Sequence, residues 1–180
     1  MMKVHVRGFS LVEVMVALIV MSVGLLGIAK MQALALASTT TARMRSLAAL
    51  EAASIASTMR ADRAYWSAVT ADPKVVIKGA AINSTADNNL LATTPACDAP
   101  GTVCTTSRIA ARDLQEWATD LSRQVPGETA TINCTPATAT LPTACTINIQ
   151  WNENQVASNA QQVTAAATPT PVSYTLYVDP

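Results

Sequence analysis

The sequence predicts an α+β protein in which one long N-terminal helix leads into a small head with a short helix and an antiparallel β-sheet. Three observations predict this fold class. Residues 9–29 are almost wholly apolar, residues 30–59 are rich in helix-forming residues, and residues 130–178 contain stretches where apolar and polar residues alternate. Alternation with a period of two is typical of a strand with one buried face. We therefore expect the helix first and the sheet last.

The composition fits one domain plus an appended element, and it excludes several function classes. Twelve Lys and Arg residues balance twelve Asp and Glu residues, and no basic stripe follows the first residues, so nucleic acid is not an expected partner. His5 is the chain's one histidine, and the sequence has no phosphate-binding glycine loop, no G-x-S-x-G and no H-E-x-x-H. We predict a protein that is not an enzyme and has no catalytic residue, cofactor or metal.

The first thirty residues predict a membrane helix. Residues 1–8 form a short basic leader, and the 21 residues from Phe9 to Ala29 contain one charge, Glu13. At about 1.5 Å per residue this run spans roughly 31 Å, enough to cross the core of a bilayer. It is longer than the apolar region of a cleaved secretory signal, which is about 7–15 residues.

Glu13 is unusual because a carboxylate within a membrane span costs roughly 2.5–3.5 kcal/mol on insertion scales. One interpretation is that Glu13 lies near the interface and has no function. The other is that it awaits a positively charged partner within the membrane. We favour the second, because Ser10 and Glu13 are the only polar residues in the first turns.

Residues 3–18 resemble the class III signal sequence of type IV pilins. A short basic leader ends at Gly8, and Phe-x-Leu-x-Glu at residues 9–13 opens a long apolar helix. The continuation, residues 19–32, contains Gly-Leu-Leu-Gly-Ile-Ala and resembles the PilV group of minor pilins. The resemblance implies a ladle-shaped α+β fold and a minor pilin that helps to start or cap pilus assembly.

The resemblance also implies how the chain is processed and what it binds. Prepilin peptidase would cut between Gly8 and Phe9 on the cytoplasmic side and N-methylate Phe9. Glu13 would then face the new amine of Phe9, on its own or a neighbouring subunit, as the helix docks in the filament. The implied partners are the peptidase, the inner membrane, and other minor pilins and the major pilin through the N-terminal helix. The implied location is the inner membrane with a periplasmic head, and then the pilus at the cell surface.

One feature departs from many major pilins, which carry a proline inside the first helix. Here no proline occurs before Pro73, and Gly24 and Gly27 are the only helix-weakening residues in the span. The sequence thus gives no support for local melting of the helix during assembly. The absence of this proline suits a minor pilin at least as well as a major pilin.

Two other functions stay open. A minor pseudopilin of a type II secretion system would share the leader, Phe9 and Glu13, although the glycine-containing segment and the cysteine pairs favour the pilus. The second alternative is a secreted or anchored periplasmic binding module. Ala33-Leu34-Ala35 and Ala35-Leu36-Ala37 resemble signal-peptidase sites, and cutting there would remove the membrane helix.

Residues 30–59 predict that the helix continues beyond the membrane. One apolar stripe is expected to pack against the head: Met44, Leu47, Ala48, Ile55 and Met59. The charged residues are expected mostly on other faces: Arg43, Arg45, Glu51 and Arg60. The Ser-Thr-Thr-Thr run at 38–41 is a predicted weak point of the helix.

A second helix is predicted at residues 108–125, with Ser107 as its N-cap and Pro126-Gly127 at its end. Its apolar face comprises Ala110, Leu114, Trp117, Ala118, Leu121 and Val125. The acidic residues on the other side are Asp113, Glu116 and Asp120. They could bind a cation or act as paired carboxylates, but we favour a solvated helix face.

The rest of the head reads as strands and loops. Predicted strands cover residues 130–134, 147–151 and 172–178, and residues 74–78 predict a strand or an extension beside a helix. Residues 79–107 and 152–171 are predicted loops. The predicted division of the chain is a leader at 1–8, a membrane helix at 9–30, a periplasmic continuation at 31–62 and a head at 63–180.

The four cysteines are Cys97, Cys104, Cys134 and Cys145, and neither C-x6-C nor C-x10-C is a zinc spacing. We expect structural disulfides. Of the three possible pairings, Cys97–Cys104 with Cys134–Cys145 closes the shortest loops, each worth roughly 2.5–3 kcal/mol. Disulfides indicate an oxidising compartment such as the periplasm, which places the leader in the cytoplasm. Charge alone gives no orientation, because basic residues flank the apolar run on both sides.

Overall fold

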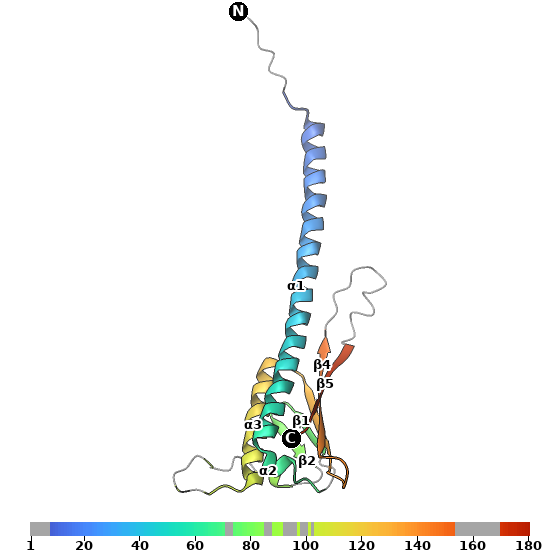
Figure 1. The fold of residues 1–180 in the computed structure, drawn as a ribbon. Coiled ribbons are helices and arrows are strands. Elements are labelled where there is room, and N and C mark those ends of the chain that lie inside the picture. The colour runs from blue at the N-terminus through green and yellow to red at the C-terminus, as the bar shows by residue number, and fades with distance from the viewer. Residues whose placement is uncertain are drawn as a thin grey trace, which may run out of the picture. The chain divides into compact units, whose positions relative to one another are not determined.

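The computed structural model describes residues 8–70, 74–84, 88–91, 97, 101, 103–153 and 170–180. It has the predicted α+β architecture (Figure 1). The helices are α1 (Leu11–Ala61), α2 (Arg63–Trp66) and α3 (Thr106–Gln124), with a 3₁₀ turn η1 (Asn88–Leu91). The strands are β1 (Lys74–Lys78), β2 (Ala81–Ser84), β3 (Thr129–Thr135), β4 (Ala144–Glu153) and β5 (Thr170–Val178).

The chain forms two compact units, residues 1–40 and residues 41–180, so the boundary lies inside α1. The first unit contains residues 11–40 of α1, and the second, called the head below, contains residues 41–61 of α1 and everything after them. The head therefore includes the C-terminal part of α1. The finer division of the helix at residues 30/31 stays a prediction.

Within the head, residues 41–61 of α1 present one face to the core. The fully buried residues on this face include Ala48, Ala52, Ile55, Ala56 and Met59, and Met44 and Leu47 are partly buried against them. Their spacing of three and four residues places them on one side of a helix, which confirms the predicted stripe. Glu51 was expected on another face, and this was wrong, because it is buried among the same residues.

Helix α3 begins and ends close to the predicted positions. Its predicted apolar residues are all buried: Ala110, Leu114, Trp117, Ala118, Leu121 and Val125. The predicted N-cap Ser107 was wrong, since the helix begins at Thr106 and Thr105 precedes it with extended backbone. Val125 leaves the helical conformation, and Gly127 follows with φ of 75°, a left-handed conformation that glycine adopts without strain.

The five strands form one antiparallel sheet in the order β2-β1-β3-β4-β5. The predicted strands are confirmed, and residues 74–78 form β1, which pairs with both β2 and β3. Strand β2 and the turn η1 lie in the segment predicted as loop, so that prediction was wrong for residues 81–84 and 88–91. Gly79, with φ of 58°, turns the chain between β1 and β2. The other predicted loop, residues 152–171, was wrong at its ends, since residues 152–153 belong to β4 and residues 170–171 belong to β5. Its residues 154–169 lie outside the described residues.

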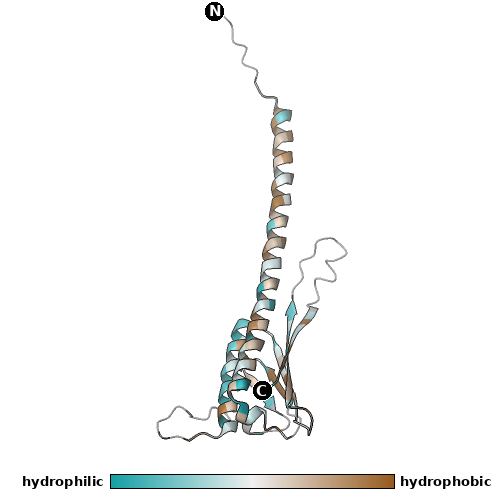
Figure 2. Ribbon diagram, viewed as in Figure 1, coloured by the Kyte–Doolittle hydropathy of each residue, from teal (hydrophilic) through white to brown (hydrophobic). Residues whose placement is uncertain are grey.

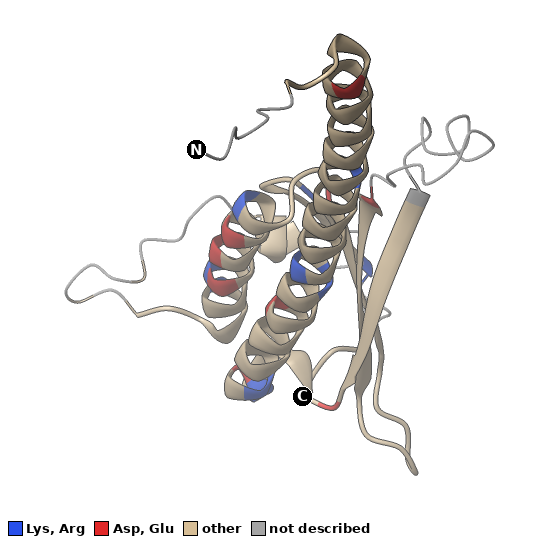
Figure 3. Ribbon diagram, turned by 90° about the horizontal axis from the view of Figure 1, so that it is seen from above, with Lys and Arg blue, Asp and Glu red and all other residues tan. Residues whose placement is uncertain are grey.

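The core of the head lies between its helices and one face of the sheet. Figures 1 and 3 show α3 and the head part of α1 side by side on the same side of the sheet. The inward residues of the central strands are fully buried, among them Ile77, Ile132, Ile147 and Ile149. Trp117 of α3 donates its indole N–H to the carbonyl of Glu51 at 2.9 Å, so the two helices also share a buried hydrogen bond.

Candidate functional site

The predicted cleavage point lies just before α1. Gly8, Phe9 and Ser10 precede the helix, and the Phe9 residue is 83% exposed. The carbonyl of Ser10 accepts the N–H groups of Glu13, at 3.0 Å, and Val14, at 3.3 Å, so the first helical turn starts here. The peptide bond between Gly8 and Phe9 therefore lies outside the helix, where a peptidase can reach a chain without unwinding it.

Glu13 lies in the first turn of α1, at the same end of the helix as Phe9. The N-terminus of a helix carries a partial positive charge that stabilises a nearby carboxylate by about 0.3–1 kcal/mol. Ser10 and Glu13 also have the spacing of a capping box, in which both side chains satisfy free N–H groups. Glu13 thus has a local role available to it besides pairing with an amine, and an experiment has to separate the two.

Residues 11–29 of α1 present apolar side chains on every side of the helix. Consecutive large side chains such as Leu11, Val12, Leu25 and Leu26 are all exposed. Residues 30–40 also include polar residues, so hydrophilic bands appear further along α1 (Figure 2). The helix is long and apolar enough to cross a membrane, and its most apolar 18-residue window has a mean hydropathy of 2.5 with none of it buried. A helix that is hydrophobic all round belongs in lipid or among other helices.

Three hydroxyl groups of this first unit are satisfied within the helix. Ser22 donates to the carbonyl of Ile19 at 2.8 Å, while Thr39 and Thr40 donate to the carbonyl of Leu36 at 2.8 and 2.9 Å. Such bonds remove the cost of an unpaired hydroxyl in an apolar environment. Helix α1 also continues through the predicted weak point at residues 38–41.

The head contains two disulfides, Cys97–Cys104 and Cys134–Cys145, the same pairs that proximity in the sequence favours. Cys134 and Cys145 are directly opposite each other on β3 and β4, with a Cα–Cα distance of 4.0 Å, and both are buried. Cys97 and Cys104 are only half-buried, and Cys104 lies two residues before α3. One bridge thus lies within the sheet, and the other ties a loop to the start of a helix.

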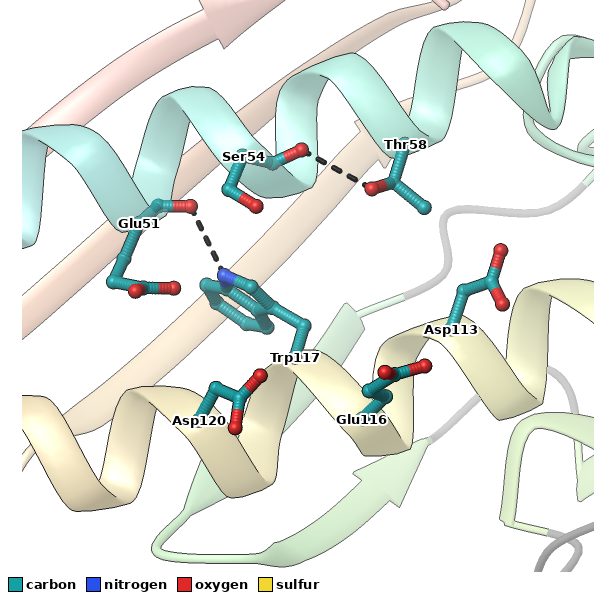
Figure 4. A pocket seen from close by; sticks show the side chains of 7 residues that line it. All are labelled: Glu51, Ser54, Thr58, Asp113, Glu116, Trp117 and Asp120. Carbon is teal, nitrogen blue, oxygen red and sulfur yellow. Dashed lines mark hydrogen bonds between the residues drawn. The ribbon is translucent and has the colours of Figure 1, made fainter.

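The head also has an acidic groove between α1 and α3, with a volume of about 350 Å³ (Figure 4). Its lining consists of Glu51, Ser54, Thr58, Asp113, Glu116, Trp117 and Asp120. Figure 3 shows the acidic residues of α3 as successive red bands along the helix. Glu116 and Asp120 are exposed, as expected for a solvated face. Asp113, which forms an ion pair with Arg112 at 3.0 Å, is half-buried.

Glu51 is the one carboxylate of the groove that is almost fully buried, with 8% of its surface exposed. Burial raises the pKa of its carboxyl, and the negative charge of Asp120 raises the pKa further. Hydrogen bonds from Gln124 and Trp117 oppose this rise. Sequence reasoning missed Glu51, although its position one turn after Ala48 and one turn before Ile55 could have indicated burial.

The groove lacks the parts of a reaction centre. Its side chains are carboxylates, hydroxyls and an indole, and the Thr58 hydroxyl donates to the carbonyl of Ser54 and not to a carboxylate that could act as a base. In the part of the chain that the structure describes, no cluster of His, Cys, Asp or Glu has the arrangement needed to hold a metal ion. The carboxylates can attract positive charge, and their arrangement offers no further chemistry.

Comparison with known proteins identifies the N-terminal segment. Residues 4–29 match the prokaryotic N-terminal methylation motif, which covers the predicted cleavage point, Glu13 and the whole apolar run from Phe9 to Ala29. Neither a curated protein nor a solved structure matches the chain. Proteins with this motif are structural subunits and not enzymes. Together with the long N-terminal helix and the α+β head, the motif makes this chain a type IV pilin-like protein with a prepilin leader.

Proposed function

We propose that the chain is a minor pilin of the PilV kind, which joins other minor pilins to start or cap a type IV pilus. Residues 1–8 are the leader, and prepilin peptidase cuts after Gly8 and methylates the new amino group of Phe9. Residues 9–30 anchor the subunit in the inner membrane, with the head in the periplasm. The helix then passes from lipid into the filament.

The observation that carries this proposal is the position of Glu13 in the first turn of α1, where residues 11–29 otherwise present apolar side chains on all sides. An ionised carboxylate in an apolar environment is stable only with a partner of opposite charge. Cleavage after Gly8 creates such a partner, because the new ammonium group lies at the same end of the helix. A charge-assisted hydrogen bond between the two then offsets most of the desolvation cost.

Two further features support the proposal. The exposed apolar surface of residues 11–40 has no partner within its own unit, so assembly with neighbouring helices is a way to bury it. The disulfides of the head agree with a periplasmic location, because such bonds persist in oxidising compartments. A binding module released by cutting at residues 33–37 would leave Glu13 and the methylation motif without a use.

The test is to locate the protein in cells that express it at native level. Shearing the cells releases surface filaments, and the proposal predicts that the protein sediments with them. Deleting the pilus assembly ATPase should abolish its presence in the sheared fraction, whereas deleting the type II secretion ATPase should leave it unchanged.

The second candidate is a minor pseudopilin of a type II secretion system, because the methylation motif is common to both classes. This candidate predicts the opposite pattern. Loss of the chain would then stop protein secretion, and loss of the pilus assembly ATPase would have no effect on its location.

A further inference from the structure

Strand β5 forms one edge of the head sheet. It pairs with β4 along its whole length, and within the described residues no strand lies on its other side. Residues 170–178 contain no Lys, Arg, Asp or Glu, and the only proline is Pro171 near the start. Native edge strands are usually short, charged or interrupted by proline, because a long neutral edge accepts another strand. From Val172 to Val178, β5 has none of these protections.

The core beneath β5 is less completely covered than the core beneath β4. Ile147 and Ile149 of β4 are fully buried, whereas their partners on β5, Leu176 and Tyr174, are only half-buried. Val172 is likewise half-buried beside a buried tryptophan of β4. The apolar row of the inner face therefore continues to the edge of the sheet, where an added strand would cover the exposed parts of these three side chains.

The opposite edge is a poorer acceptor. Strand β2 has four residues, and its inner face contributes one half-buried apolar side chain, Ile82. A strand of this length offers few backbone groups for pairing. An incoming strand thus gains more backbone hydrogen bonds and more apolar contact at β5 than at β2.

We propose that the free edge of β5 binds an extended, uncharged segment of a neighbouring subunit by strand addition. Alternate apolar residues of that segment would lie beside Val172, Tyr174 and Leu176 on the inner face. The backbone edge selects an extended segment, and the absence of charge on β5 favours a segment without charge. This inference rests on the proposed function, since assembly is what brings neighbouring heads together.

Symmetry argues that the added strand is not β5 of a second copy. Two copies of β5 can pair antiparallel about a two-fold axis, but that axis also reverses the direction of residues 41–61 of α1. Subunits that enter one membrane share a single direction, so this arrangement does not fit them. Parallel pairing about an axis along the strand would place the two inner faces on opposite sides of the sheet.

The test measures hydrogen exchange of β5 amides in the full chain, purified in detergent micelles. The probe is a seven-residue peptide of alternating threonine and valine, and the control is the same peptide with N-methyl groups on alternate amides. In the protein alone, every second amide of β5 should exchange quickly, because it points away from β4. At ten times its Kd, the unmodified peptide should slow these amides roughly tenfold, and the control peptide should not.

Several results would overturn the proposal. One is that neither peptide, or both peptides equally, slows the alternate amides. Another is that these amides are already protected without peptide. If the amides are protected without peptide in a dimeric sample, a second copy covers the edge of β5. If they are protected without peptide in a monomeric sample, another part of the same chain covers it.

A pair of variants sharpens the test. Tyr174→Lys places a charge that reaches solvent at the free edge but would be buried by an added strand, so it should abolish the peptide effect. Tyr174→Leu keeps an apolar residue there and should retain it. If Tyr174→Lys fails to fold, the comparison of the two peptides on the unmodified protein still tests the proposal. Because the assay uses purified protein, its outcome is independent of whether the chain is found in pili.

Discussion

The two units of this molecule use apolar residues in opposite ways, although one helix runs through both. In residues 41–61 of α1, one face of apolar side chains is buried in the core of the head. In residues 11–40, large apolar side chains point outward on all sides. The head can therefore fold around its own core, whereas the first unit needs lipid or other helices. The same secondary structure thus serves stability in one unit and assembly in the other.

The largest expected effect comes from removing a core side chain of the head. Leu114→Ala deletes a fully buried side chain and should lower the free energy of unfolding of the head by about 2–5 kcal/mol. Leu26→Ala, in the first unit, should leave that free energy unchanged, because Leu26 is exposed. Urea unfolding of both variants in micelles, followed by tryptophan fluorescence, measures the difference. Equal destabilisation by both variants would contradict the division into two units.

The disulfides should differ in their resistance to reduction. Cys134–Cys145 is buried between paired strands, so a reductant should reach it only when the head unfolds, whereas the half-buried Cys97–Cys104 should be reduced in the folded protein. Alkylation and mass spectrometry after mild reduction would identify which cysteines react first. Replacing both Cys134 and Cys145 by alanine should cost roughly 3 kcal/mol. Simultaneous reduction of the two disulfides under native conditions would contradict the prediction that only Cys97–Cys104 is accessible in the folded protein.

Glu13→Gln should leave membrane insertion intact and lower the amount of the protein in sheared pili. A charge-assisted hydrogen bond contributes about 1.5–3 kcal/mol, which corresponds to a loss of incorporation of roughly tenfold or more. Quantitative immunoblots of membrane and pilus fractions measure this ratio.

Ser10→Ala is the matched control for Glu13→Gln, because it removes the hydroxyl that a capping box at residues 10–13 would use and keeps the carboxylate. Incorporation close to that of the unmodified chain is expected. If the two variants lose incorporation equally, Glu13 acts only by stabilising the first turn of the helix.

The smallest effects concern two buried carboxyl groups of the head with opposite pKa shifts. Burial raises the pKa of Glu128, although backbone N–H groups, including that of Gly79, partly offset the rise. Its ionised form therefore destabilises the fold above the raised pKa, and this penalty disappears as the pH falls towards the ordinary pKa of glutamate. Glu128→Gln should raise stability at pH 7 by about 1 kcal/mol and have less effect in mild acid.

Glu153 provides the contrasting case. Its two carboxylate oxygens each accept an N–H of Arg45 at 3.0 Å, and this interaction lowers the pKa of Glu153. The stability it contributes is present above the ordinary pKa of glutamate and is lost as the pH falls through the lowered value. Glu153→Gln should therefore destabilise the head at pH 7 and have little effect in strong acid. Urea unfolding as a function of pH checks both variants, and shifts of the same sign would contradict the pKa assignments.

Much of the fold can be predicted from periodicity. The apolar faces of α1 and α3 and three of the strands follow from patterns of three to four or of two residues. Strand β2 could not be predicted, because it is four residues long and Ile82 is its only large apolar residue. The N-cap of α3 was misplaced by two residues, since Ser and Thr occur together at residues 105–107 and each is a plausible cap.

The N-terminal segment and the acidic groove also differ in how far the sequence predicts them. The leader, Phe9 and Glu13 are neighbours in the sequence, so a short motif was enough to predict them. The acidic groove joins residues 51–58 to residues 113–120, and only tertiary packing brings these segments together. Periodicity gave the face on which Asp113, Glu116 and Asp120 lie, and it could have indicated that Glu51 is buried. It could not show that Glu51 lies near Asp120, because the two residues belong to different helices.

The most direct test of this account is the intact mass of the protein recovered from sheared pili, measured with and without reduction. The account predicts a chain that begins at Phe9, carries one N-terminal methyl group, and gains the mass of four hydrogens on reduction of its two disulfides. A chain that retains residues 1–8 in filaments, or one that begins after residue 37, would contradict the central claim that residues 9–40 join the subunit to its neighbours.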